Sequence, residues 1–106
     1  MPAYAIGHLH NVHMGPDIAE YVRAIDATFE PFGGRWLIHD VKPEVKEGTW
    51  DGDLIVIAFP DLESARAWYR SDAYQRIVPL RTNNSDGPIA LFDGVPDGHR
   101  GADILG

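Results

Sequence analysis

The chain has 106 residues, 44% of them hydrophobic and 24% charged, which is typical of one ordinary globular domain and excludes a disordered chain. Nine basic and 16 acidic residues give a net charge of −7. That charge disfavours non-specific binding to nucleic acid or an anionic membrane, because both need a basic surface. Cysteine is absent, which excludes disulfides, thiolate metal ligands and a cysteine nucleophile.

Neither an apolar run of ~18 residues nor a basic segment followed by an apolar one is visible in the sequence, so a membrane span and a signal peptide are not predicted. We therefore expect a cytoplasmic protein that binds neither membrane nor nucleic acid.

Residues 3–12 predict the first strand, because the run lacks proline and charge and alternates in side-chain type. Alternation divides its side chains between two faces: Tyr4, Ile6, His8 and His10 on one, and Ala5, Gly7 and Leu9 on the other.

Residues 17–30 predict a helix whose apolar side chains recur every three or four positions. Asp17 is its expected N-cap, with Glu20 completing a capping box, and Pro31 ends it.

Two further strands follow. Residues 35–46 predict a long or bent edge strand, because Pro43 lies past its centre; Arg35 and His39 would share one face of it, and Trp36 and Ile38 the other. Residues 53–59 are almost wholly apolar, which is typical of a central strand buried on both faces.

The second half of the chain predicts a helix capped by Asp61, a short helix over residues 72–78 capped by Ser71 and ended by Pro79, and a last strand over residues 89–95. We expect one domain over residues 1–95 and a loose C-terminal tail over residues 96–106.

The order strand, helix, strand, strand, helix, strand favours an α+β fold of the ferredoxin-like, split βαβ type. This is a four-stranded antiparallel sheet with its helices on one face. The chain has no element left to cover the other face, although the central strand is apolar on both sides. We therefore expect a homodimer in which two sheets pack face to face.

Short motifs support this arrangement: residues 1–4 (MPAY), 33–37 (GGRWL), 47–50 (EGTW), 54–60 (LIVIAFP), 65–69 (ARAWY), 71–75 (SDAYQ) and 79–81 (PLR). On these motifs the chain resembles the small bacterial proteins of the domain-of-unknown-function family thirteen-thirty, within the dimeric α/β-barrel superfamily. The resemblance runs from Met1 to about Val95, and residues 67–74 are its most specific part.

The resemblance implies a ferredoxin-like fold and a dimer that forms a barrel with an interior cleft, but it implies no reaction. Some members of the wider superfamily are cofactor-free monooxygenases, lactone isomerases or dehalogenating enzymes, and a transfer of those activities would rest on fold analogy alone. His8, His10 and His39-Asp40 depart from the family pattern and are the features particular to this chain.

His8 and His10 would point to the same side of their strand, where two imidazoles can chelate a divalent metal, with His39 as a third candidate ligand. The alternative is a set of hydrogen-bonded histidines in a polar interior. Because that alternative is the more common, no metal and no cofactor is our main expectation.

Arg35 is a candidate anion-binding residue, since its planar guanidinium can hold a carboxylate or an enolate in bidentate fashion. The equally weighted alternative is a structural ion pair, for example with Glu47. Three aromatic residues and one histidine are candidate ligand contacts: Trp50, Tyr69, Tyr74 and His8. Trp68 is expected in the core.

These residues suggest a dimer that binds or transforms a small, partly apolar molecule with an anionic or carbonyl group. A histidine (His10 or His39) would act as general base, and Arg35 would stabilise the developing oxyanion. The alternatives are a non-catalytic dimerisation or stress-associated module and a histidine-ligated, metal-dependent enzyme.

Overall fold

The computed structural model describes the whole chain, residues 1–106. Its main elements are β1 (Ala3–Leu9), α1 (Pro16–Phe29), β2 (Arg35–Ile38), β3 (Asp53–Phe59), α2 (Leu62–Arg70), α3 (Asp72–Thr82) and β4 (Ile89–Asp93). There are also two short 3-10 helices: η1 (Glu30–Phe32) follows α1, and η2 (Gly101–Leu105) lies in the C-terminal tail.

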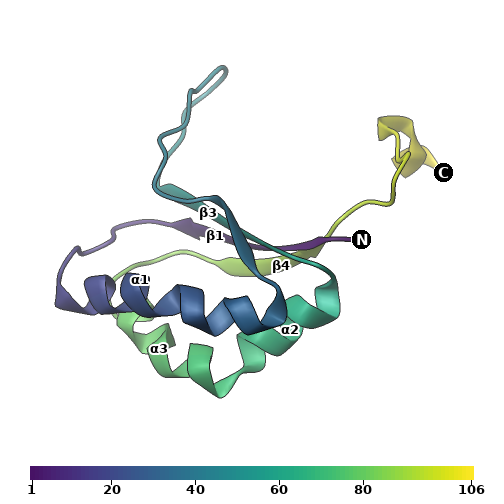
Figure 1. Cartoon of the computed structure of the whole chain (residues 1–106). Helices are drawn as coiled ribbons and strands as arrows, with labels where there is room; N and C mark the ends of the chain where they lie inside the picture. The colour runs from purple at the N-terminus through teal and green to yellow at the C-terminus, as the bar shows by residue number, and fades with distance from the viewer.

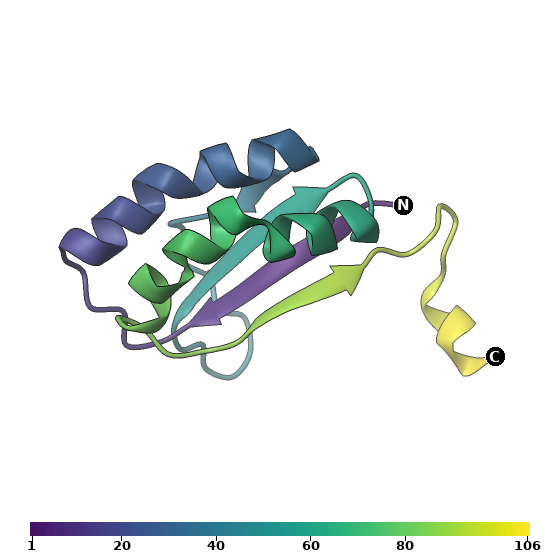
Figure 2. The ribbon, with the colours of Figure 1, turned by 90° about the horizontal axis from the view of Figure 1, so that it is seen from below.

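The four strands form one antiparallel sheet in the order β2-β3-β1-β4, and all three α-helices cover the same face of it (Figures 1 and 2). This confirms the predicted ferredoxin-like fold. The two helices predicted for the second half of the chain, α2 and α3, meet at Ser71.

The alternation predicted for β1 is confirmed. Ala3, Ala5 and Leu9 are buried beneath the helices, whereas Tyr4, Ile6 and His8 lie on the other face and are only partly buried. We call this second side of the sheet the open face. The opposing residues of β3 continue it, because Ile6 pairs with Val56 and His8 with Leu54.

The start of α1 differs from the prediction. Gly15 is the N-cap, with extended backbone and no side-chain hydrogen bond, and Pro16 takes the first helical position. Proline is favoured there, because its missing N–H needs no partner in the first turn. Asp17 therefore lies inside the first turn, where its carboxylate accepts a hydrogen bond from Asn84 Nδ2 at 3.2 Å.

The predicted long strand over residues 35–46 is wrong beyond Ile38. The register between β2 and β3 shifts between Trp36 and Ile38, and Asp40 adopts a positive φ of 56° that turns the chain away from the sheet. The shift changes which side chains share a face. Arg35 pairs with Ala58 and so lies on the open face, but His39 stacks on Trp36 on the helix side, with ring centroids 4.1 Å apart.

The caps predicted for the second half of the chain are confirmed. Asp61 accepts a hydrogen bond from Ser64 N at 2.7 Å, and this contact lowers the pKa of the Asp61 carboxyl. The prediction that Pro79 ends the third helix is wrong, because α3 continues to Thr82. Only one hydrogen-bond donor is lost at Pro79, and its carbonyl still accepts from Asn83 N at 3.0 Å.

Ser71 joins α2 to α3. Its hydroxyl donates to Trp68 O at 2.7 Å and accepts from Tyr74 N at 3.2 Å. We expect Ser71→Ala to lower the free energy of unfolding by about 1 kcal/mol, because the first turn of α3 loses its cap. Ser71→Asp, which retains a capping oxygen, is the matched control in urea denaturation. An equal loss in both variants would contradict the assignment of Ser71 as the cap.

The hydrophobic core lies between the helices and the sheet. Phe59, Trp68 and Tyr74 are its largest fully buried side chains. The Trp68 ring contacts both of its neighbours in tilted arrangements, with centroids 5.3 Å from Phe59 and 4.1 Å from Tyr74. Its indole Nε1 donates to Thr28 Oγ1 at 3.0 Å, which links α2 to α1.

Residues 39–52 and the C-terminal tail project from the sheet on the side away from the helices (Figure 1). The accessible surface of 7214 Å² exceeds the about 5,900 Å² typical of a folded monomer of this mass. The radius of gyration of 15.2 Å likewise exceeds the about 13 Å expected for this length. None of the helices is long and apolar enough to cross a membrane.

Candidate functional site

A cavity of about 430 Å³ lies between α1 and the helix-facing side of the sheet. Its floor includes Ala5 and Gly7, and the side chain of Ile89 packs so closely over Gly7 that a Cβ there would lie 2.7 Å from Ile89 Cδ1. The backbone of α1 packs closely along α3 and makes few close contacts with the strands. This arrangement keeps the space between α1 and the sheet open. Most of the lining is hydrophobic, so the cavity suits a small, mainly apolar molecule.

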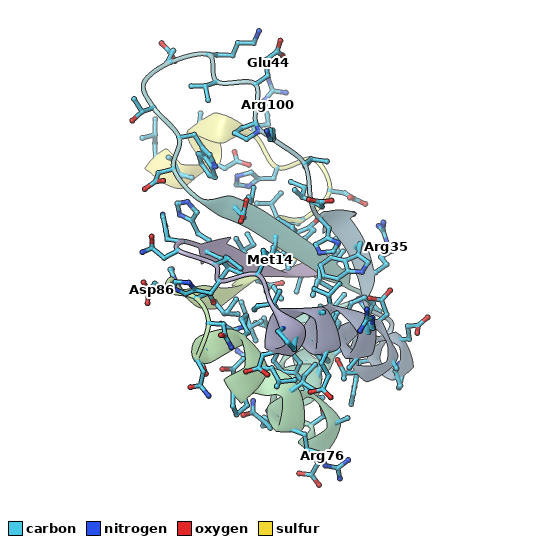
Figure 3. The ribbon with its side chains drawn as sticks, turned by 90° about the vertical axis from the view of Figure 1, so that its left-hand side faces the viewer. Met14, Arg35, Glu44, Arg76, Asp86 and Arg100 are labelled. Carbon is cyan, nitrogen blue, oxygen red and sulfur yellow. The ribbon has the colours of Figure 1, made fainter.

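The cavity reaches the surface at the end of the sheet where Met14 and Val41 contribute to its lining. These side chains are exposed, Met14 at 78% and Val41 at 63%, and Figure 3 shows Met14 at this end of the molecule, near the start of α1. Charged residues also line this region: Asp40, Lys42 and Asp53. The opening of the cavity therefore combines exposed apolar side chains with charged side chains of both signs.

Tyr21, Tyr74 and Arg81 form the polar corner of the cavity. The hydroxyls of Tyr21 and Tyr74 are 2.8 Å apart, and the Arg81 guanidinium carbon is 5.9 Å from the centroid of the Tyr21 ring. Burial, together with the nearby Tyr74 hydroxyl, raises the pKa of Tyr21 far above its ordinary value. Tyr21 is therefore a neutral phenol at physiological pH.

Arg81 is an unusual buried cation. It is only 5% exposed, and its Nε has no hydrogen-bond partner. None of the ion pairs in the structure includes it. Burial opposes its charge, but Tyr74 and Tyr21 outweigh that effect, so the pKa of Arg81 stays above its ordinary value. The cavity thus contains a positive charge without a counter-ion.

The structure separates the predicted histidines. His39 lines the cavity beside Trp36, whereas His8 and His10 lie on the open face. Within this chain, no group of three or more histidine, aspartate or glutamate residues is arranged to hold a metal ion. The three-histidine metal site considered as an alternative therefore does not form in one chain.

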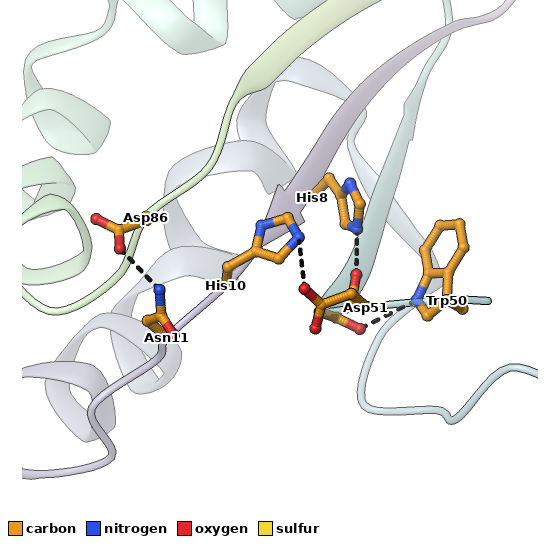
Figure 4. Close-up of polar contacts among 7 residues, drawn as sticks. His8, His10, Asn11, Trp50, Asp51 and Asp86 are labelled. Atoms are coloured by element: carbon orange, nitrogen blue, oxygen red, sulfur yellow. Dashed lines mark hydrogen bonds and ion pairs between the residues drawn. The ribbon is translucent and has the colours of Figure 1, made fainter.

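His8 and His10 hold the end of the 39–52 loop against β1 (Figure 4). His8 Nε2 is 2.6 Å from the Asp51 carbonyl oxygen, and His10 Nε2 is 3.9 Å from an Asp51 carboxylate oxygen. Trp50 packs on the His8 ring with centroids 4.8 Å apart. The chain passes so close to β1 that a Cβ at Gly52 would lie 2.5 Å from the Leu9 carbonyl oxygen.

The other predicted site residues are also distributed over both sides of the sheet. Arg35 is exposed on the open face and forms no ion pair with Glu47. Trp50 does not line the cavity, and neither does Tyr69, which is 36% exposed. Tyr74 lines the cavity as part of the polar corner.

Two residues of the polar corner, Tyr21 and Arg81, were not predicted as site residues. A signal for Arg81 exists in the sequence: Tyr74, Val78 and Arg81 are spaced by four and three positions, which places the arginine on the inward stripe of α3. A charged residue in such a stripe is rarely buried without a partner. The sequence gives no comparable indication for Tyr21, because an aromatic residue on the apolar stripe of α1 is expected in the core.

The fold and the cavity together define a small ferredoxin-like α+β domain with a ligand-sized space beneath its helices. The family model described as Domain of unknown function (DUF1330) matches residues 2–95. The chain belongs to this family, as the sequence motifs indicated. Among curated proteins, no sequence matches it.

Three solved structures share the fold of this chain. The RPA0582 protein of unknown function from Rhodopseudomonas palustris is 15% identical, with a TM-score of 0.57 over 90% of this chain and 83% of its own. SnoaB, a cofactor-independent oxygenase from Streptomyces nogalater, is 15% identical, with a TM-score of 0.53 over 93% and 98%. A conserved protein from Methanosarcina mazei Go1 is 16% identical, with a TM-score of 0.50 over 90% and 95%. At these identities the likeness shows the fold alone.

Proposed function

We propose that this protein binds a small, partly apolar molecule with one anionic or carbonyl group in the cavity beneath α1, and that it does so as a homodimer. The observation that carries the proposal is the polar corner within an otherwise mainly apolar cavity. A volume of about 430 Å³ lies in the range of about 300–1,000 Å³ found for small-molecule sites. Gap-free packing would be the rule for a purely structural core.

The second part of the proposal, the dimer, is supported by the open face and the projecting segments. Apolar side chains occupy both central strands of this face, including Ile6, Leu54 and Val56. The 39–52 loop and the tail extend on the same side and expose Val45, Ile104 and Leu105. A second copy placed against the open face would cover these surfaces.

The open face is a second candidate ligand surface. The rings of His10 and Trp50 both contact the His8 ring there, and Arg35 lies on the same side of the sheet. In a dimer these groups would line the barrel interior, so the predicted roles of His10 and Arg35 would be exercised there rather than in the cavity. Conversion of a bound molecule, if it occurs, would by analogy of fold with SnoaB need no cofactor.

Native mass spectrometry of untagged, gently purified protein tests both parts of the proposal. We expect a dimer that carries an additional organic mass. Ile18→Trp should lose that mass while remaining dimeric, because Ile18 lines the cavity and the larger ring fills it. Ala73→Trp, on the exposed face of α3, is the matched control and should keep it. A bare monomer would contradict the dimer, and retention of the mass by Ile18→Trp would place the ligand elsewhere.

A further inference from the structure

We propose that the ligand of the cavity is a monocarboxylate with an apolar body and that Arg81 binds its carboxylate. This inference rests on the proposed function and specifies its ligand. The polar corner offers a cation that lacks a counter-ion, and no group of this chain supplies one. A buried charge is strongly unfavourable unless it is paired, so the site is incomplete until an anion enters.

The neighbouring Tyr21 cannot serve as that anion. Burial raises the pKa of Tyr21, so its hydroxyl stays protonated. The cation–π contact of Arg81 with the Tyr21 ring, at 5.9 Å, offsets only part of the cost of burying a full charge. The Tyr21 hydroxyl therefore remains a hydrogen-bond donor, as well as an acceptor, next to the guanidinium.

The donor pattern of the corner matches a carboxylate. Tyr21 and Tyr74 share one hydrogen bond, which leaves the second O–H hydrogen of the pair free to donate. The Arg81 Nε–H is also without a partner. A carboxylate only accepts hydrogen bonds, and its two oxygens fit the planar fork of an arginine. A neutral carbonyl would accept the same bonds but would leave the charge of Arg81 uncompensated.

The remainder of the cavity favours a single charge. The walls present the rings of Trp36 and Trp68 and the aliphatic side chain of Ile25. Asp40, Lys42 and Asp53 line the cavity as well, and because the two carboxylates outnumber the one ammonium, this region disfavours a second anionic group on the ligand. With one arginine at the corner, a phosphate dianion would be compensated only in part. The structure thus favours a monoanion with an aromatic or branched apolar body.

The test compares 3-phenylpropionate with its neutral amide, 3-phenylpropionamide, which has nearly the same shape. Binding is followed by the indole N–H signals in ¹⁵N nuclear magnetic resonance spectra. Trp36 and Trp68 line the cavity and should shift, whereas Trp50 lies outside it and serves as an internal control. We expect the carboxylate to bind at least about tenfold more tightly than the amide, as charge-assisted hydrogen bonds are stronger than neutral ones.

Arg81→Met should remove this preference, so that the amide binds at least as well as the carboxylate. Arg76→Met, at an exposed position on the same helix (Figure 3), is the matched control and should retain it. Where Arg81→Met does not fold, Arg81→Lys replaces it and should lower the preference, because the bidentate fork is lost.

Equal binding of the two probes, with shifts at Trp36 and Trp68, would overturn the carboxylate assignment and leave the proposed function standing. An absence of shifts with both probes would also overturn the assignment. The additional mass in native mass spectrometry then decides whether the proposed function falls with it.

Discussion

Trp68→Ala is expected to lower the free energy of unfolding by about 3–5 kcal/mol, the usual range when a buried tryptophan is truncated in a core. Trp68 is 1% exposed, and its ring contacts Phe59 and Tyr74. The substitution would leave a void that joins the cavity which Trp68 already lines. It would also remove the donor to the Thr28 hydroxyl, a buried group that is costly to leave with fewer partners.

Urea denaturation followed by circular dichroism measures this loss. Trp50→Ala is the matched control: Trp50 is 43% exposed, and its indole Nε1 donates only to Gly52 O within its own loop, at 3.0 Å. We expect it to cost less than about 1.5 kcal/mol, since little apolar area leaves a buried site. A loss of similar size in both variants would mean that Trp68 is not the centre of the core.

Elements with strong local patterns were predicted well from the sequence. The apolar run of β3 has the predicted bounds, Asp53–Phe59, because a strand between two neighbours is apolar whatever its partners are. The caps Asp61 and Ser71 were also predicted, since an N-cap depends on backbone groups two or three residues away. The order of these elements was sufficient to predict the sheet topology.

Features that depend on distant contacts were not predicted. The bulge in β2 depends on its pairing with β3. Because of this bulge, His39 points toward the helices, whereas Arg35 points to the open face. The meeting of Tyr21 with Arg81 depends on how α1 packs along α3. No spacing in the sequence specifies that packing, so Tyr21 and Arg81 were missed, although Tyr74 was predicted as a site residue.

The polar corner lies away from the interface of the proposed dimer. The cavity is on the helix side of the sheet and the predicted interface is on the open face, with the sheet between them. Loss of the dimer therefore need not remove the polar corner. Ligand binding in the cavity and formation of the dimer can therefore be tested separately by substitution.

Ile6→Lys is expected to dissociate the proposed homodimer, raising its dissociation constant by about 30- to 1,000-fold, which corresponds to about 2–4 kcal/mol at the centre of an interface. Ile6 lies in the middle of β1, opposite Val56 of the neighbouring central strand, and its side chain points to the open face. In a two-fold symmetric dimer the open faces of the two copies contact each other. One substitution in the chain therefore introduces two buried charges into the interface. The open face already carries Arg35, His8 and His10, and it offers a lysine no nearby carboxylate partner from the strands.

Analytical ultracentrifugation of the variant and of Ala73→Lys, which adds the same charge at an exposed position of α3, measures the effect at equal protein concentration. The control should sediment as the dimer and Ile6→Lys as the monomer of 11.8 kDa. Because the polar corner lies across the sheet, the Ile6→Lys monomer should still prefer 3-phenylpropionate to its amide. A dimer that persists in Ile6→Lys would show that the two copies do not meet through the open face. A monomer that also loses this preference would show that the cavity depends on the partner chain.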